Sequence, residues 1–389
     1  MSFSSMSKQQ ALCAGGEEDA RGEDEVMELI PGLPEEVAEK CLLHLPFLYH
    51  RLFRTVSSNW NRFLTADTPA AKPSSTPPPT TMSLSLPFLF AFAFDPVSRR
   101  LQCQALDPFS RRWLLLPPVP VPCGGGGVAA GSFAVVALPA RGEIYVIGGV
   151  EEDGGEKPVR SVAVYSAATN GWGLATPMRT ARGYMSAGEV GGRVVVAGED
   201  GDAEVLDPES GTWTPAAVRA GAAVARYDSA ACGGRLYVTE GWAWPFERAP
   251  RGAVYEAATD SWAEMARGMR EGWTGSCAVS GGRMYIVAEY GEWRVKRYDC
   301  ARDEWRMVGG GGVPAEVRRP HAVAGEVGEV GGGRRRIYVV GAGLDVAVGT
   351  VSAVHGAEEE EEERVEWEVV KGPAEFVGLA PCNAQVLYA

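Results

Sequence analysis

A tryptophan that recurs through most of this 389-residue chain constrains its fold more than any other feature. Six tryptophans stand about 40 to 60 residues apart, and each follows a short run of strand-forming residues. Self-similarity at this period indicates a protein built from repeated supersecondary units. The runs are Phe88–Phe94, Ile144–Gly149, Val194–Gly198, Leu236–Thr239, Met284–Val287 and Ile337–Gly341, and the tryptophans are Trp113, Trp172, Trp213, Trp262, Trp305 and Trp367.

Each repeated unit is interpreted as four short strands. One strand lies between the apolar run and the tryptophan and ends in a turn, as in Ala163–Thr169 and Val205–Pro208, and the tryptophan opens the outermost strand. An isolated unit of this kind cannot bury both of its faces, whereas units arranged around an axis bury them against their neighbours. The repeat therefore predicts an all-β propeller over residues 84–389.

The first unit lacks an innermost strand, because only a Pro-rich segment precedes Leu86. The segment Pro381–Tyr388 follows the last repeat tryptophan and has the length of one strand. We expect this C-terminal strand to pair in the first blade and to close a ring of six blades. A ring of five blades is the alternative.

Glycine pairs distinguish between the repeat families that have this period. Gly233-Gly234 and Gly281-Gly282 precede strand runs that contain a tyrosine, and a tryptophan follows each run, without the Gly-His and Trp-Asp pairs of other propellers. The units thus resemble kelch repeats. We assign the repeat tryptophans and the strand tyrosines to packing rather than to a binding site. These tyrosines are Tyr145, Tyr237, Tyr285 and Tyr338.

The N-terminal part of the chain has a different composition. Residues 1–27 are rich in Ser, Gly, Glu and Asp, which predicts a disordered acidic leader. Residues 28–66 carry apolar residues at helical spacing, which Pro46 divides into two short helices. Residues 67–83 are rich in Pro, Thr and Ser and are expected to form a linker.

The helical segment resembles an F-box, in which two Leu-Pro pairs, an acidic start and a Val-x-x-x-Trp ending recur together. That resemblance implies docking on a Skp-family linker protein, which carries the cullin and the ubiquitin-conjugating machinery. Cys41 stands where the family has a larger aliphatic residue, and His50 stands where it has a leucine. A simple helical cap on the propeller is the alternative. The matching residues, which we expect to contact the linker protein, are Leu33, Pro34, Val37, Leu42, Leu45, Pro46, Val56 and Trp60.

Together the two parts resemble plant F-box/kelch proteins over residues 28–389, with distinctive strings at Glu240–Phe246 and Glu271–Gly275. The resemblance implies the substrate-recognition subunit of an SCF ubiquitin ligase, acting in phytochrome A far-red light signalling in the nucleus, the cytoplasm or both. Two alternatives stay open. One is a non-degradative scaffold, and the other is an adaptor for turnover of a metabolic enzyme.

Two sets of residues are candidates for contact with a protein target. Rigid aromatic side chains in loops are typical of binding hot spots, and arginines before innermost strands are suited to reading carboxylates. The alternatives are that the rings pack between blades and that the arginines pair with acidic residues of the chain. The aromatic candidates are Trp242, Trp244, Phe246 and Trp273, and the arginines are Arg182, Arg226 and Arg319.

Charge and motif content exclude several other functions. The chain has 50 acidic against 37 basic residues, a net charge of −13, and such a surface repels phosphate backbones and anionic lipids. Nucleic acid and membranes are therefore not expected partners. The acidic run Glu358–Glu363 is expected to be solvated.

The sequence carries no catalytic motif. Its eight cysteines are scattered, its histidines number four, and neither the Gly-x-Ser-x-Gly elbow nor the Walker loop occurs. We expect no cofactor, no metal and no intrinsic enzyme activity.

Overall fold

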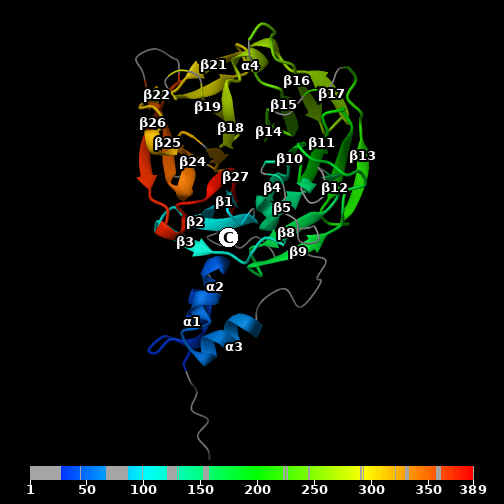
Figure 1. Cartoon of the computed structure of the whole chain (residues 1–389). Helices are drawn as coiled ribbons and strands as arrows, with labels where there is room; N and C mark the ends of the chain where they lie inside the picture. The colour runs from blue at the N-terminus through cyan, green and yellow to red at the C-terminus, as the bar shows by residue number, and fades with distance from the viewer. Residues whose placement is uncertain are drawn as a thin grey trace, which may run out of the picture.

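The computed structural model shows a ring of six β-sheets with three helices beside it (Figure 1). It describes residues 28–66, 86–120 and 129–388, apart from gaps at 44, 99, 130, 152–156, 222–223, 225–226, 244–245, 290, 292, 320, 329–332 and 356–360. The leader and linker expected at 1–27 and 67–83 lie outside the described residues. Within the described part, no helix is long and apolar enough to cross a membrane.

The helical module contains α1 (Glu35–Leu43), α2 (Phe47–Phe53) and α3 (Ser58–Ala66). Pro46 is the N-cap of α2, as its fixed φ allows. The sequence predicted two helices, and this is wrong because a turn after Phe53 ends α2. The side chain of Ser57 then accepts a hydrogen bond from the Trp60 N–H and starts α3. The core of the module consists of Leu29, Ala38, Leu42 and Leu64.

Each of the six sheets is a blade, with strands named here from the ring axis outward. Blade 1 has β27 (Ala380–Tyr388), β1 (Pro87–Asp95), β2 (Arg100–Asp107) and β3 (Arg112–Leu115). Blade 2 has β4 (Ala134–Leu138), β5 (Glu143–Ile147), β8 (Val162–Ser166) and β9 (Gly171–Ala175), and β6 (Val150–Glu151) pairs with β7 (Lys157–Pro158) beside it. Blade 3 has β10 (Ser186–Val190), β11 (Arg193–Ala197), β12 (Ala203–Asp207) and β13 (Thr212–Ala216).

The other half of the ring follows the same order. Blade 4 has β14 (Asp228–Cys232), β15 (Arg235–Thr239), β16 (Gly252–Glu256) and β17 (Ser261–Glu264). Blade 5 has β18 (Gly275–Ser280), β19 (Arg283–Ala288), β20 (Val295–Asp299) and β21 (Glu304–Met307). Blade 6 has β23 (Ala322–Gly325), β24 (Arg335–Val340), β25 (Val346–His355), β26 (Glu361–Val370) and, parallel to β26, β22 (Gly309–Gly310).

The C-terminal strand closes the ring. Strand β27 pairs antiparallel with β1 over its whole length, with Leu89 opposite Val386. This confirms the expected closure in the first blade, and the six-blade count is confirmed against the five-blade alternative. Because the first and last parts of the ring share one sheet, neither end of the ring leaves a broad open edge.

The repeat tryptophans tie neighbouring blades together. In five of the blades, the indole Nε1 on the fourth strand from the ring axis donates to a backbone carbonyl in the connection that enters the blade. These bonds run from Trp172 to Pro117, Trp213 to Thr176, Trp262 to Ala217, Trp305 to Met269 and Trp367 to Gly311, at 2.8 to 3.1 Å. Trp113 differs, because its ring packs against Phe376 and its Nε1 has no hydrogen-bond partner among the described residues.

The ring has two distinct faces, because antiparallel strands place alternate connections at opposite ends. The inter-blade face carries the connections between blades and the loops between second and third strands, such as 240–251 and 289–294. The hairpin face carries the turns between first and second strands and between third and fourth strands, such as 108–111. Helix α2 lies next to blade 1 (Figure 1). There Tyr49 contacts Asp107, which begins a turn of the hairpin face.

The end of the acidic run is buried, which corrects the expectation that the whole run is solvated. Glu363 lies in β26 and is almost completely enclosed. Its Oε1 accepts hydrogen bonds from Arg283 at 2.7 Å and from Tyr285 at 3.1 Å, and Arg335 lies 3.4 Å away. Arginines on neighbouring strands thus neutralise a carboxylate that an acidic run alone would leave in water.

Candidate protein-binding surfaces

The helical module exposes large apolar side chains. Five of them are between 38% and 60% exposed, although burial would be favourable for each. A module whose described residues include four in its buried apolar core has little capacity to enclose more. Exposed apolar side chains gathered on a small module are typical of a protein-binding surface. They are Leu33, Val37, Leu43, Leu52 and Val56.

The residues expected to contact a linker protein differ in their exposure. Leu33, Pro34, Val37 and Val56 are exposed, whereas Leu45, Pro46 and Trp60 are half-buried. Leu42 is buried in the module core with Ala38 and Leu64, so its expected place on the surface is a correction. A helix of this length has one inward face, and Leu42 follows Ala38 on it by one turn.

Trp60 and His50 stabilise the module from within. The Trp60 Nε1 donates to the Leu29 carbonyl at 2.6 Å, and its ring centroid lies 6.0 Å from that of Phe53. His50 is buried, with Nε2 2.9 Å from the Leu45 carbonyl oxygen. Burial lowers the pKa of His50 against the opposing effect of that bond, which favours a neutral ring. Its departure from the family pattern therefore lies inside the module, whereas that of Cys41 lies on its surface.

On the propeller, the loop 240–251 carries two of the aromatic candidates into the inter-blade face. An ion pair between Arg251 and Glu240 closes its base at 2.8 Å. The Trp242 Nε1 donates to the Glu271 carbonyl at 2.8 Å, which fixes the half-buried ring against the adjacent helix α4 (Arg267–Gly272). Phe246 is exposed. Trp244 lies outside the described residues.

Trp273 is not available to a target, which corrects the expectation for this residue. Its ring is fully buried among Met265, Met269 and Met284. Its Nε1 donates to Asp228 at 3.0 Å, and its ring meets that of Trp305 edge to face. Its partners come from blades 4 and 5 and from α4, so the side chain packs between blades.

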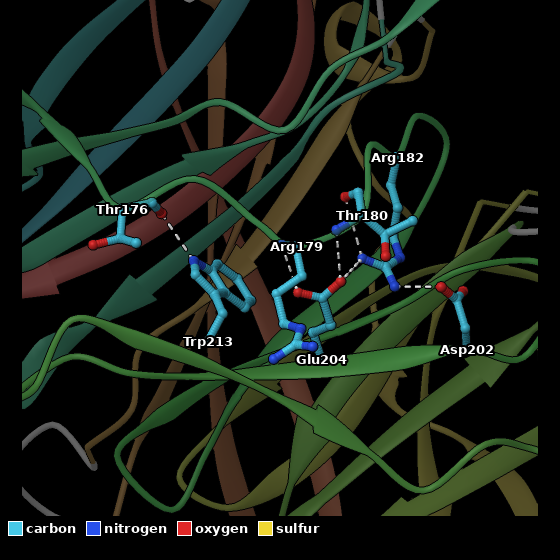
Figure 2. Close-up of polar contacts among 7 residues, drawn as sticks. All are labelled: Thr176, Arg179, Thr180, Arg182, Asp202, Glu204 and Trp213. Atoms are coloured by element: carbon cyan, nitrogen blue, oxygen red, sulfur yellow. Dashed lines mark hydrogen bonds and ion pairs between the residues drawn. The ribbon is translucent and has the colours of Figure 1, made fainter.

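The expectation that Arg182 contacts a target is also corrected, because its guanidinium is paired with acidic residues of the chain (Figure 2). Arg182 is buried and bonded to Asp202 and Glu204. Glu204 also accepts the backbone N–H groups of Arg179 and Thr180 at 2.9 and 3.0 Å. Burial raises the pKa of Glu204, but these hydrogen bonds and the Arg182 charge outweigh it and leave that pKa lowered. The cluster braces the connection between blades 2 and 3.

Arg319 is exposed on the inter-blade face. Its Nη2 lies 3.1 Å from Glu289 Oε2, and its guanidinium carbon lies 5.3 Å from the centroid of the Trp293 ring. The Trp293 ring in turn meets His321 edge to face. This arrangement holds a cation and an aromatic ring in one orientation. Arg226, the third arginine candidate, lies outside the described residues.

Backbone strain marks three aromatic positions, two of which the sequence did not identify. Tyr184, Phe246 and Trp293 have φ values of 50°, 67° and 54°. Bulky side chains rarely adopt this left-handed region, and such strain gathers at binding sites. All three lie in connections of the inter-blade face. No sequence signal reveals a positive φ at an aromatic residue, so only Phe246 was selected from sequence.

The ring axis contains a narrow channel of about 330 Å³. Its lining comes from the innermost strands and consists mainly of small side chains such as Ala187, Ala230, Ala278 and Ala324. Among the described residues, no group of histidine, cysteine, aspartate and glutamate is arranged to hold a metal ion.

Comparison with known proteins covers both parts of the chain. Residues 30–68 match the F-box domain family. The chain is 37% identical to F-box protein AFR of Arabidopsis thaliana over 369 residues, which cover 92% of each chain. It is 35% identical to F-box/kelch-repeat protein At1g30090 of the same plant, over 93% of this chain and 87% of that protein. F-box/kelch-repeat protein At1g22040, also of Arabidopsis thaliana, is 26% identical over 79% of this chain and 77% of its own length.

Proposed function

The chain belongs to the F-box/kelch-repeat family, and from this premise we propose that it is the substrate-recognition subunit of an SCF-type ubiquitin ligase. The helical module binds a Skp-family linker protein, which brings the cullin. The propeller binds the protein to be ubiquitinated. The chain holds the two together and performs no chemistry of its own, since the ubiquitin-conjugating enzyme supplies the reactive thioester.

The observation that carries this proposal is the exposed apolar surface of the helical module. Leu52 and Val56, at the end of α2 and in the following turn, are 56% and 60% exposed. Leu43 and Val37 on α1 add to this surface. A linker protein that covers these side chains would supply the apolar contacts that the small module lacks.

The inter-blade face is the proposed site of target recognition. It carries the exposed Phe246 and Tyr184 and the stacked pair of Arg319 and Trp293. Aromatic and arginine side chains held in fixed orientations are the residue types that dominate binding energy at protein interfaces. This face is opposite to the one that α2 contacts, so target and linker protein would not compete for space.

The finer setting of this activity rests on similarity. The likeness to F-box protein AFR supports a role in phytochrome A far-red light signalling, in the nucleus, the cytoplasm or both. An adaptor for turnover of a metabolic enzyme is the alternative within the same biochemical function.

The test is coexpression of the chain with a Skp-family linker protein and a cullin. We expect the parent chain to copurify with both and Val56→Asp to lose at least about tenfold in affinity, because a buried unpaired charge is costly. Val97→Asp is the matched control, since Val97 is a 92% exposed valine on the propeller. Thermal unfolding of all three proteins excludes a folding defect.

The outcome separates an adaptor from a scaffold. If the parent chain does not bind the linker protein, the adaptor function is wrong, and the propeller acts as a non-degradative scaffold. If it binds, proteasome inhibition should raise the level of the bound target in cells. A bound partner whose level stays constant under inhibition would contradict degradation.

A further inference from the structure

Helix α2 is anchored in the propeller as well as in the helical module. Leu48 is buried in the core of blades 1 and 2, in one cluster with Phe88 and Phe90. The ring of the adjacent Tyr49 meets Phe88 edge to face at 6.0 Å. Two consecutive residues of one helix thus pack on the ring, while Leu52 of the same helix is exposed.

A partly buried hydrogen bond accompanies this packing. The Tyr49 hydroxyl donates to Asp107 Oδ2 at 2.7 Å and lies 3.2 Å from Ser110 Oγ. Asp107 is itself held by the turn that follows β2, where its oxygens accept the N–H of Phe109 and the hydroxyl of Ser110. The turn therefore holds the Asp107 carboxylate independently of Tyr49, and this fixes the direction of the Tyr49 hydrogen bond.

Blade 3 shows what the same turn is like without a contact from α2. Asp207 occupies the equivalent place after β12 and accepts the N–H of Glu209 and the hydroxyl of Ser210, both at 3.0 Å. No tyrosine hydroxyl bonds to it among the described residues, and it is half-buried, whereas Asp107 is buried. The contact with Tyr49 is thus an addition to the repeat and not part of the blade structure.

The covalent connection does not fix this geometry. A stretch as long as residues 67–85 reaches about 60 Å when extended, so its length is compatible with many orientations of the helical module. The orientation depends instead on the contacts of α2. Through Leu48 and Tyr49 the module is held at the hairpin face, on the side of the ring opposite to the proposed target face.

We propose that Tyr49 is a positioning residue, which with Leu48 locks the helical module to blade 1 and sets the direction of the linker-binding surface relative to the target face. This inference rests on the proposed function. A fixed gap between a bound target and the ubiquitin-conjugating enzyme restricts which lysines of the target are reached, because a rigid spacer removes most of the arrangements that a flexible one samples.

The test measures the distance between the two parts in the full chain. Nitroxide labels are placed at Cys41 on α1 and Cys300 on the hairpin face, both exposed, with the other cysteines replaced. We expect one narrow distance distribution in the parent chain. Removal of the hydroxyl in Tyr49→Phe should broaden it about twofold, and removal of the ring in Tyr49→Ala should broaden it further.

Tyr255→Phe is the matched control, because the Tyr255 hydroxyl donates to Asp260 at 2.8 Å in blade 4, away from the helices. It should leave the distribution unchanged. All variants should keep the melting temperature of the propeller and should bind the Skp-family linker protein as the parent does. These two controls exclude a folding defect as the cause of a broader distribution. A broad distance distribution in the parent chain, or an unchanged distance distribution in Tyr49→Ala, would contradict the proposed positioning role of Tyr49.

Failure of this inference and failure of the proposed function give different results. If the lock is wrong, labels in Tyr49→Ala report the parent distribution while the linker protein still binds. If the adaptor function is wrong, the linker protein does not bind the parent chain, whatever the distance distribution shows.

Discussion

Five of the six repeat tryptophans use the ring N–H to hold the backbone of the preceding connection, while their indoles pack in the blades. The tyrosines of the third strands support them. The rings of Tyr165 and Trp172 lie 5.3 Å apart, and Tyr298 and Trp305 lie 5.2 Å apart. A residue that satisfies both packing and a buried carbonyl is difficult to replace. This explains why tryptophan recurs at this position of the repeat.

Trp213→Phe should lower the stability of the ring, because it leaves the Thr176 carbonyl without its indole donor. The lost hydrogen bond adds about 1 kcal/mol to the packing loss. Trp113→Phe is the control, since the Trp113 Nε1 has no partner among the described residues. Thermal unfolding should show the larger decrease for Trp213→Phe. Equal decreases would mean that the indole hydrogen bond adds nothing to packing.

The Arg182 cluster makes stability depend on pH. The pKa of Glu204 is lower in the folded protein than its ordinary value of 4.5, so the folded state binds fewer protons than the unfolded chain in this range. Its contribution is present above about pH 4.5 and is lost as the pH falls through the lowered pKa. The stability difference between the parent and Glu204→Gln should therefore be large at pH 7 and shrink as the pH falls below 4.5.

The measurement is the melting temperature of both proteins across this pH range, with Glu209→Gln as an exposed control in the same blade. The control should track the parent at every pH. A difference in melting temperature between the parent and Glu204→Gln that stays constant with pH would show that the charge of the carboxylate does not contribute to stability.

At the scale of elements, β26 is held in place by charge as well as by its sheet. Its residue Glu363 lies within 3.6 Å of Arg283, Arg297 and Arg335, which come from β19, β20 and β24. The carboxylate thus joins blades 5 and 6. The sequence of successive glutamates does not show which of them is buried. Only the position on the strand distinguishes the buried Glu363 from its neighbours.

Glu363→Gln should destabilise the ring by about 3 to 5 kcal/mol, the range measured when one partner of a buried ion pair is removed. Glu366→Gln, on the same strand but exposed, should change stability little. Chemical denaturation of both variants gives the comparison. A small effect of Glu363→Gln would indicate that the arginines are satisfied without this carboxylate.

At the scale of the whole molecule, a large ring and a small helical module share one contact region. The ring closes on itself through β27 and β1, whereas the module has a small core, to which four buried apolar residues of its described part belong. Stability in such a molecule is not uniform, because a small core opens more readily than a large one. The binding partner of the module is therefore expected to stabilise it.

Amide hydrogen exchange should show this difference. We expect α1 and α3 to exchange at least about tenfold faster than β1 and β5 in the free chain, because their local opening costs less free energy. Addition of a Skp-family linker protein should slow exchange in α1 and α3 and leave β1 and β5 unchanged. Uniform protection of the helices in the free chain would contradict the marginal stability of the module.

The sequence alone determined the blades and the helical module. Strand runs, turns and tryptophans follow one another within each unit, so residues close in sequence specify each blade. The C-terminal strand at Pro381–Tyr388 belonged to no complete unit, and the first blade lacked one strand. Burial and pairing were decided only by the tertiary structure. Leu42 and Trp273 are buried and Arg182 meets Glu204 because of elements that pack on them from elsewhere in the fold. Tyr49 and Asp107 are far apart in sequence, and no local pattern connects them, because their contact exists only once the helix lies on the closed ring.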